Sequence, residues 1–115
     1  MSEREAPRRG ELWTVAGGPA CAGKPRPALV VQSDIYARLG SVTICGLTAF
    51  PADAPVTRPL VERSPMNGLE TPSRVMVDKI TTVRRTSFGH RIGTLDDSDL
   101  ERVDRALLVY LGLSR

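Results

Sequence analysis

Short strand-forming runs make up most of the chain, and connections rich in glycine and proline separate them. Glu11-Leu-Trp-Thr-Val15 alternates and contains residues that favour strands. A loop of glycine, proline and small residues follows it, and long loops in compact domains are often functional. Further strands are expected at 28–32, 41–50, 60–62 and 75–83, with a last one near Ile92. Such a series predicts a mostly antiparallel sheet.

Only the end of the chain has the periodicity of an amphipathic helix. Its apolar face consists of Leu100, Val103, Leu107 and Tyr110. We expect this face, the tyrosine included, to pack against the core. Asp96 or Ser98 can cap the first turn, since Ser98 together with Glu101 fits a capping box. Gly112 is a natural stop, so the helix is predicted at about 97–111.

These elements predict a mainly β protein of the α+β class, a small curled barrel with a helix on its periphery. Residues 1–8 are polar and charged, and they are expected to form a flexible segment. Residues 9–115 are expected to form one domain, because a chain of 115 residues leaves little room for a second core.

Composition excludes several classes of protein. No apolar run approaches the ~18 residues that a membrane-spanning helix requires. The N-terminal residues are charged and lack the apolar stretch of a secretory signal. The two cysteines, Cys21 and Cys45, form no C-x-x-C pair, which argues against structural zinc and against a disulfide scaffold. The cytoplasm is therefore the expected compartment.

The net charge is +3, and arginine dominates the basic residues. Only Lys24 and Lys79 are lysines among the 16 basic side chains. Because arginine offers two-pronged hydrogen bonding to phosphate, this bias fits a polyanionic partner. A genome of high GC content gives the same bias without any such partner, so composition leaves both interpretations open.

The segment Lys24-Pro25-Arg26-Pro27 is the most suggestive local motif. The two prolines stiffen the backbone and hold Arg26 extended at the start of a strand, after a glycine-rich loop. A cation held in this way suits a reacting phosphate, although a solvated arginine at a proline-rich strand start is the simpler interpretation. His90 is the only histidine, which excludes a metal centre or a nuclease pair built on several histidines.

Several longer segments resemble the MazF/PemK family of toxins. In the first half these are Arg9-Gly10-Glu-Leu-Trp13, Gly23-Lys-Pro-Arg-Pro-Ala-Leu-Val-Val-Gln-Ser-Asp34 and Leu47-Thr-Ala-Phe50. In the second half they are Ser73-Arg-Val-Met-Val-Asp-Lys-Ile-Thr-Thr-Val83, Ile92-Gly-Thr-Leu-Asp-Asp97 and a pattern from Val103 to Leu113. The segments follow the family order and span about residues 8 to 113.

The resemblance implies a small SH3-like barrel of the MazF/PemK/CcdB type, assembled as a homodimer. It also implies cleavage of single-stranded mRNA at specific sequences without a metal or another cofactor. In that reaction the ribose 2′-OH attacks the adjacent phosphate and leaves 2′,3′-cyclic phosphate and 5′-OH ends. The family's catalytic arginine falls on Arg26 and its threonine on Thr48. An aspartate that joins catalysis in one branch of the family falls on Asp78, where an ion pair of structural importance is the alternative.

The resemblance also suggests which residues bind RNA. Trp13 and Phe50 flank the two catalytic motifs and are candidate platforms for base stacking, although the tryptophan fits the core equally well. Lys24, Ser73 and Arg74 are further candidates for the RNA groove. The chain departs from some relatives by having cysteine and proline where they have a glutamate and a histidine, at positions 21 and 25. His90 is expected to be a surface residue without an assigned role.

Three functions remain to be compared. The first is the endoribonuclease toxin, which requires a cognate MazE-like antitoxin with an acidic or partly disordered segment to cover the basic groove. The second is a non-enzymatic toxin that binds and poisons DNA gyrase, as a related barrel toxin does. The third is a catalytically inert nucleic-acid-binding barrel. The presence of both Arg26 and Thr48 favours the enzyme.

Overall fold

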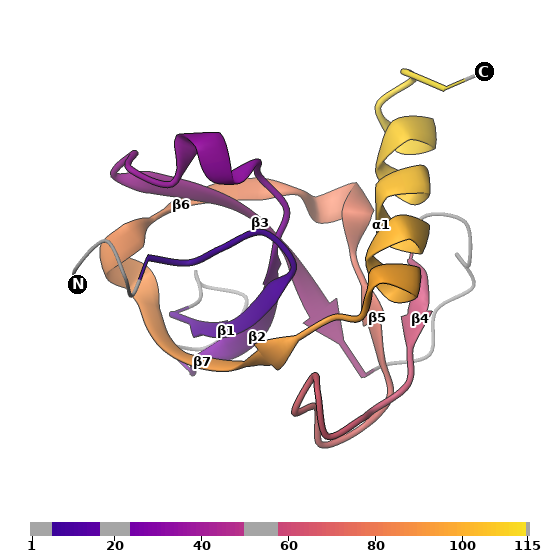
Figure 1. Ribbon diagram of the computed structural model, residues 1–115, viewed down its shortest axis with the longest axis horizontal. Helices are drawn as coiled ribbons and strands as arrows, with labels where there is room; N and C mark the ends of the chain where they lie inside the picture. Colours follow the sequence, from indigo (N-terminus) through magenta and orange to yellow (C-terminus); the bar gives the residue numbers. More distant parts are fainter. Residues whose placement is uncertain (1–5, 17–23, 50–57, 115) are drawn as a thin grey trace.

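The computed structural model describes residues 6–16, 24–49 and 58–114. The strands in them are β1 (Glu11–Val15), β2 (Arg26–Val30), β3 (Ser41–Thr48), β4 (Leu60–Val61), β5 (Ser73–Val75), β6 (Thr81–Arg84) and β7 (Phe88–Thr94). They pair antiparallel in the order β4-β5-β3-β2-β1-β7, and β6 pairs with β3. The sheet curls into a barrel, and the helix α1 (Asp97–Tyr110) stands at its side (Figure 1). The predicted mainly β fold with a C-terminal helix is confirmed.

Most of the expected strands are present with shifted ends. The runs at 11–15, 28–32, 41–50, 60–62 and near Ile92 correspond to β1, β2, β3, β4 and β7. β2 begins at Arg26 and not at Ala28, so that Pro27 lies within the strand. The strand accepts this proline because β2 follows a connection and its first residues pair only with β1.

The alternation of side chains in β1, β2 and β3 divides the interior into two hydrophobic clusters. Leu12 and Leu29 are cross-strand partners, as are Leu29 and Cys45, and all three face the cluster that α1 covers. The next pair, Trp13 and Ala28, faces the second cluster, which fills the barrel. Because successive side chains of a strand point to opposite faces, one short strand contributes to both clusters.

Helix α1 follows the sequence expectation at both ends. The side chain of Asp96 caps it by accepting a hydrogen bond from the backbone N–H of Asp99 at 2.8 Å. Gly112, with φ of 73°, follows the last turn. Val103 is fully buried, but Tyr110 is 44% exposed, so its predicted place in the core was wrong. The last turn projects past the barrel, as Figure 1 shows, and little protein remains there to cover the ring.

The expected long strand at 75–83 is wrong. The chain instead forms β5, a 3₁₀ turn at Val77–Lys79, and β6. The cause is the pairing with β3. Leu47 faces Val75 and Ile44 faces Thr81, so three steps along β3 correspond to six steps along the segment from Val75 to Thr81. The surplus residues leave the sheet as the turn.

The beginning of the described chain is packed. Ala6 and Pro7 are buried, and the backbone N–H of Arg8 donates to Glu11 Oε1 at 2.7 Å. Residues 1–5 lie outside the described part, and the flexible segment expected at residues 1–8 stays a prediction. In the described ranges, no helix is long and apolar enough to cross a membrane.

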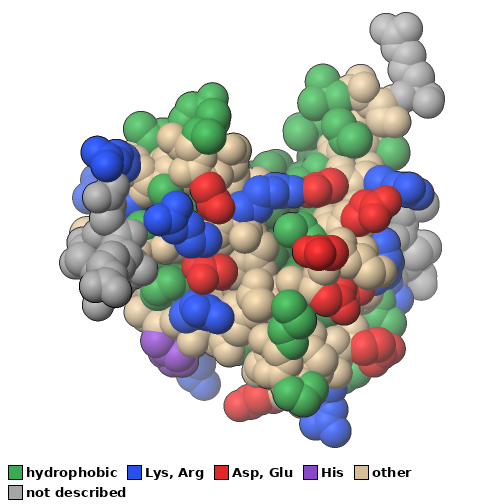
Figure 2. All heavy atoms as spheres, viewed as in Figure 1, with side chains coloured by type: hydrophobic (Ala, Val, Ile, Leu, Met, Phe, Trp, Pro, Cys, Tyr) green, Lys and Arg blue, Asp and Glu red, His purple; other side chains and the backbone are tan. Residues whose placement is uncertain are grey.

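Exposed large apolar side chains cluster in two places. One is the connection between β2 and β3, where Ile35 is 80% exposed; the other is the end of α1, where Leu113 is 71% exposed just after the helix. Figure 2 shows hydrophobic side chains gathered on two prominences with a hollow between them. Apolar surface of this kind is typical of interaction sites.

Candidate functional site

A pocket of about 970 Å³ lies where β1, β2 and β3 end together. Its lining comes from Thr14 in β1, residues 25–27 at β2, 46–49 at β3, 68–71 between β4 and β5, Ser73, Met76, and 90–92 in β7. The volume is at the upper end of the range for small-ligand sites, which leaves room for part of a longer substrate.

Arg26 is the cation at the start of β2. It is exposed and lines the pocket, and its backbone lies in register with Val15 of β1. Pro25 and Pro27 restrict the backbone on both sides of it, which limits where the side chain begins. Among the described residues, none makes a hydrogen bond or ion pair with the guanidinium. The group is therefore available to an anion in the pocket.

Thr48 is brought to the same pocket by the register of the sheet. Arg26 and Thr48 each lie two residues beyond Ala28 and Gly46, the last pair between β2 and β3, and so they occupy the same end of the two strands. Thr48 is half-buried. An alcohol and a guanidinium at one strand end can together bind the oxygens of a phosphate.

A rigid connection between β4 and β5 forms the opposite wall. Asn67 is buried, and its side-chain oxygen accepts hydrogen bonds from the backbone N–H groups of Ser64 and Leu69 at 3.0 and 2.9 Å. Its amide donates to the carbonyl of Glu62 at 2.9 Å. Because a single buried side chain satisfies three backbone groups, residues 68–71 are held in place against the pocket.

Ser73 lines this wall but is only 5% exposed. Its hydroxyl donates to the carbonyl of Thr71 at 3.0 Å. The hydroxyl proton is therefore used in a hydrogen bond within the turn, and the hydroxyl oxygen can still accept a hydrogen bond.

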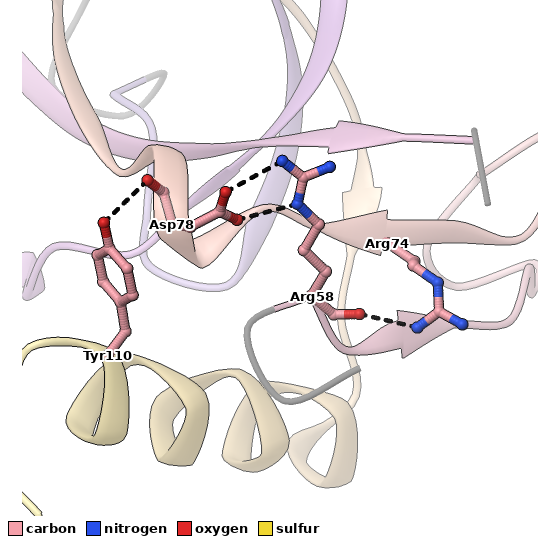
Figure 3. A network of polar contacts seen from close by, with 4 residues as sticks. All are labelled: Arg58, Arg74, Asp78 and Tyr110. Atoms are coloured by element: carbon pink, nitrogen blue, oxygen red, sulfur yellow. Dashed lines mark hydrogen bonds and ion pairs between the residues drawn. The ribbon is translucent and has the colours of Figure 1, made fainter. Parts of the chain in front are cut away.

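Asp78 lies outside the lining of the pocket, in an ion pair with Arg58. Both carboxylate oxygens accept from the guanidinium, from Nε and Nη2, at 3.0 Å. These hydrogen bonds lower the pKa of Asp78 and raise that of Arg58. Figure 3 shows the pair next to Arg74, which donates to the carbonyl of Arg58, and Tyr110, whose hydroxyl donates to the carbonyl of Asp78. The network joins α1, the 3₁₀ turn and the segment before β4.

The other described candidates for RNA binding do not line the pocket. Trp13 is 7% exposed and packs edge-to-face on Phe88 with centroids 5.8 Å apart, so in this conformation a base has no ring face to stack on. Lys24 is exposed just before β2 but does not line the pocket. Arg74 is half-buried and held by Arg58. Phe50 and Cys21 lie outside the described residues.

Sequence analysis missed five polar residues of the described lining: Thr14, Glu70, Thr71, His90 and Arg91. His90 is exposed on β7, as expected, but the pairing of β7 with β1 brings it to the same pocket as Arg26. Their separation along the chain gave no signal of this, because only the strand order reveals it. Across the described ranges, no group of three or more His, Cys, Asp or Glu side chains is arranged to hold a metal ion.

The fold and the pocket define a class: small curled β-barrels with an arginine and a threonine at one pocket. A family model described as the PemK-like, MazF-like toxin of type II toxin–antitoxin systems matches residues 8–111. The chain is 47% identical over 107 residues to a probable endoribonuclease MazF of Mycolicibacterium smegmatis, covering 93% of this chain and 98% of that one. It is 32% identical over 110 residues to endoribonuclease MazF6 of Mycobacterium tuberculosis, covering 91% and 96%.

The chain belongs to the PemK/MazF toxin family, as its motifs indicated. Among solved structures, an endoribonuclease in complex with its cognate antitoxin from a mycobacterial species superimposes with a TM-score of 0.78. That match covers 96% of this chain and 99% of the other at 23% identity, and it supports the fold. The alternative of a gyrase-binding toxin has no support in these comparisons.

Proposed function

We propose that this protein is the toxin of a type II toxin–antitoxin system and acts as a sequence-specific endoribonuclease on single-stranded mRNA, which inhibits translation and growth. The family match supports this proposal, and so do the relatives that are named as endoribonucleases. The observation that carries it is the convergence of Arg26 and Thr48 on one pocket at the ends of β2 and β3.

The reaction that fits the pocket uses the RNA as its own nucleophile. The 2′-oxygen attacks the adjacent phosphorus, the bond from phosphorus to the 5′-oxygen breaks, and 2′,3′-cyclic phosphate and 5′-OH ends result. The protein has to stabilise the negative charge on the pentacoordinate phosphate and move protons. Arg26 supplies the cation, because an arginine stays charged and offers parallel N–H donors to phosphate oxygens.

Thr48 would complete the cradle. Its hydroxyl can donate to a phosphate oxygen or orient the 2′-OH, and both roles require that it lie beside the guanidinium. Lys24 extends the positive charge along the approach to β2, where it can attract the RNA backbone. We assign Asp78 a structural role, since Arg58 occupies both of its oxygens.

Assembly and location belong to the same proposal. The exposed apolar side chains in the β2–β3 connection and at the end of α1 support a homodimer. The basic pocket fits a cognate antitoxin with an acidic segment, and the structural relative described above was solved with its own antitoxin. We expect the protein in the cytoplasm, where its mRNA substrate is.

Incubation with RNA is the first test. The purified protein is mixed with a long single-stranded transcript in excess chelator, beside Arg26→Ala and Thr48→Val variants. We expect discrete cuts by the unmodified protein, with 5′-OH ends that a polynucleotide kinase can label and 3′ ends that carry a cyclic phosphate. Arg26→Ala should leave the RNA intact.

The matched control is Arg102→Gln, which removes an exposed arginine of α1 that does not line the pocket and that is paired with Asp99. It should cut at the same sites and rate as the unmodified protein. Intact RNA across a broad set of transcripts would overturn the proposal, as would cutting that survives Arg26→Ala. Light scattering after size exclusion measures the oligomeric state in the same preparation.

A further inference from the structure

The proposed reaction needs a proton for the departing 5′-oxygen, and few described side chains of the pocket can give one. Arg26 and Arg91 stay charged at neutral pH, and threonine hydroxyls are far too weak as acids. A glutamate such as Glu70 is ordinarily ionised and accepts a proton more readily than it gives one. Histidine is the one residue type that exchanges protons readily near neutrality, and the pocket contains His90.

A bulge in β7 brings His90 to the pocket. Trp13 faces Arg91 and Val15 faces Phe88, so two steps along β1 correspond to three along β7. Two residues of β7, Gly89 and His90, therefore lie opposite the single residue Thr14. A bulge re-aims the side chain next to it, and bulges are common beside active sites.

Thr14 fixes the bulge from the neighbouring strand. Its Oγ1 accepts a hydrogen bond from the backbone N–H of His90 at 3.0 Å and lies 3.5 Å from the ring Nδ1. A Cβ atom at Gly89 would collide with this same oxygen, so the glycine is what lets Thr14 approach. With Nδ1 facing Thr14, Nε2 is the ring nitrogen that remains for a ligand.

The order of the strands places His90 across one strand from Arg26. Strand β1 lies between them. Arg26 of β2 pairs with Val15 on one side of β1, and His90 of β7 is hydrogen-bonded to Thr14 on the other side. Two strand spacings amount to about 10 Å between backbones. Both side chains line the same pocket.

We propose that His90 is a catalytic residue that protonates the leaving 5′-oxygen, with Thr14 as its positioning residue. The inference rests on the proposed ribonuclease function. The 2′-oxygen loses its proton to a base, for which Glu70 is the carboxylate in the described lining, and forms the new bond to phosphorus. The bond from phosphorus to the 5′-oxygen breaks with its electron pair on oxygen, and Nε2–H of the imidazolium donates the proton that completes the 5′-OH. Glu70 then releases its proton to solvent, and His90 takes one up from solvent.

A modified substrate separates this role from a merely structural one. Once the cutting site is mapped, a short RNA is made with that site and a second with sulfur in place of the scissile 5′-oxygen. A thiolate leaves without a proton because thiols are much stronger acids than alcohols. His90→Gln should lower kcat/KM about 100-fold or more on the oxygen substrate and less than about 3-fold on the sulfur substrate.

The other variants define the controls. Thr14→Val should lower kcat on the oxygen substrate without raising KM, and the sulfur substrate should again suppress the effect. Arg26→Ala should stay impaired on both substrates, since charge stabilisation is needed in either case. Arg102→Gln should match the unmodified protein throughout. Thermal unfolding of each variant verifies the fold.

Dependence on pH provides an independent measurement. At pH values where the proton donor is protonated, kcat/KM keeps the full contribution of acid catalysis. At higher pH, where the donor has lost its proton, kcat/KM falls. We expect this falling limb in the unmodified protein and its absence in His90→Gln. The charged groups around the imidazole are Arg26 on β2, Glu70 on the facing wall, and Arg91 on β7, which is paired with Glu11 of β1 at 3.5 Å. Both proteins share them, so the difference between the two profiles belongs to His90.

Equal losses on the oxygen and sulfur substrates would overturn the proposal, because they would show binding or structural damage. Unchanged activity of His90→Gln on the oxygen substrate would overturn it as well. Either result still requires an unmodified protein that cuts RNA. If the unmodified protein leaves all RNA intact, it is the ribonuclease function that fails, and the two failures are thereby distinguished.

Discussion

At the scale of single residues, the shape of the cation matters as well as its charge. Arg26 presents parallel N–H donors from a strand start fixed by two prolines, whereas a lysine would place one point charge on a flexible stem. We therefore expect Arg26→Lys to keep most of the RNA affinity but to lower kcat about 10²- to 10³-fold, as the loss of one oriented donor does elsewhere. Single-turnover cleavage of the mapped RNA measures kcat, and binding to a 2′-deoxy analogue measures affinity.

Lys24→Arg is the matched control, since it makes the opposite exchange at an exposed neighbour outside the pocket lining. It should change kcat less than about 2-fold, because charge alone matters there. Full activity of Arg26→Lys would mean that the site needs only a positive charge and that the fork geometry plays no part.

The sequence identified some residues of the pocket and missed others for a physical reason. Arg26 and Thr48 lie inside contiguous motifs, so their local sequence was enough to select them. Thr14 and His90 are 76 residues apart and meet only because β7 pairs with β1. Chemistry assembled across strands depends on register, which local pattern does not encode.

At the scale of elements, the two candidate caps of α1 separate clearly. Asp96 accepts from the backbone N–H of Asp99 at 2.8 Å, and Ser98 lies inside the helix, in its first turn. Asp96→Ala should therefore lower the free energy of unfolding by about 1 kcal/mol, through loss of the hydrogen bond and of a negative charge near the helix N-terminus. Ser98→Ala should change it by less than about 0.5 kcal/mol. Urea denaturation of both variants measures the difference, and a greater loss in Ser98→Ala would contradict the assignment.

The helix and the first four strands were predictable because their periodicity reflects which side faces the core. The segment 75–83 was not, since Val75 and Val77 alternate with Met76 and Asp78 as they would in one strand. Its division is imposed by β3, which pairs with both halves. Trp13 illustrates the same limit for function. An apolar ring close to a candidate catalytic motif suits either a base platform or a core, and Trp13 is buried against Phe88 in the core.

At the scale of the whole molecule, the pair of Asp78 and Arg58 joins parts that are distant in sequence. Arg58 precedes β4, Asp78 lies between β5 and β6, and Tyr110 reaches the same turn from the end of α1 (Figure 3). The carboxylate is about one quarter exposed and receives two hydrogen bonds from one guanidinium. Such a two-pronged pair stabilises the fold more than a mobile surface pair does, and we expect it to contribute about 1 kcal/mol to the free energy of unfolding.

That pair makes stability depend on pH in a defined direction. The hydrogen bonds from Arg58 lower the pKa of Asp78 in the folded protein, so the unfolded chain takes up a proton first as the pH falls. The contribution of the pair is therefore complete above the pKa of a free aspartate, near 4, and is lost as the pH drops below it through the folded value. Asp78→Asn should lower the free energy of unfolding by about 1 kcal/mol at pH 7, and the difference should shrink as the pH falls below about 4.

Glu101→Gln provides the comparison for this last prediction, because it interrupts a pair with Arg105 in which both side chains are mostly exposed. Solvent screens that pair, so the variant should remain close to the unmodified protein at every pH. Urea denaturation at several pH values measures all three proteins. A difference between Asp78→Asn and the unmodified protein that stays constant from pH 7 to pH 3 would mean that packing around the turn, and not the ionised carboxylate, links α1 to the sheet.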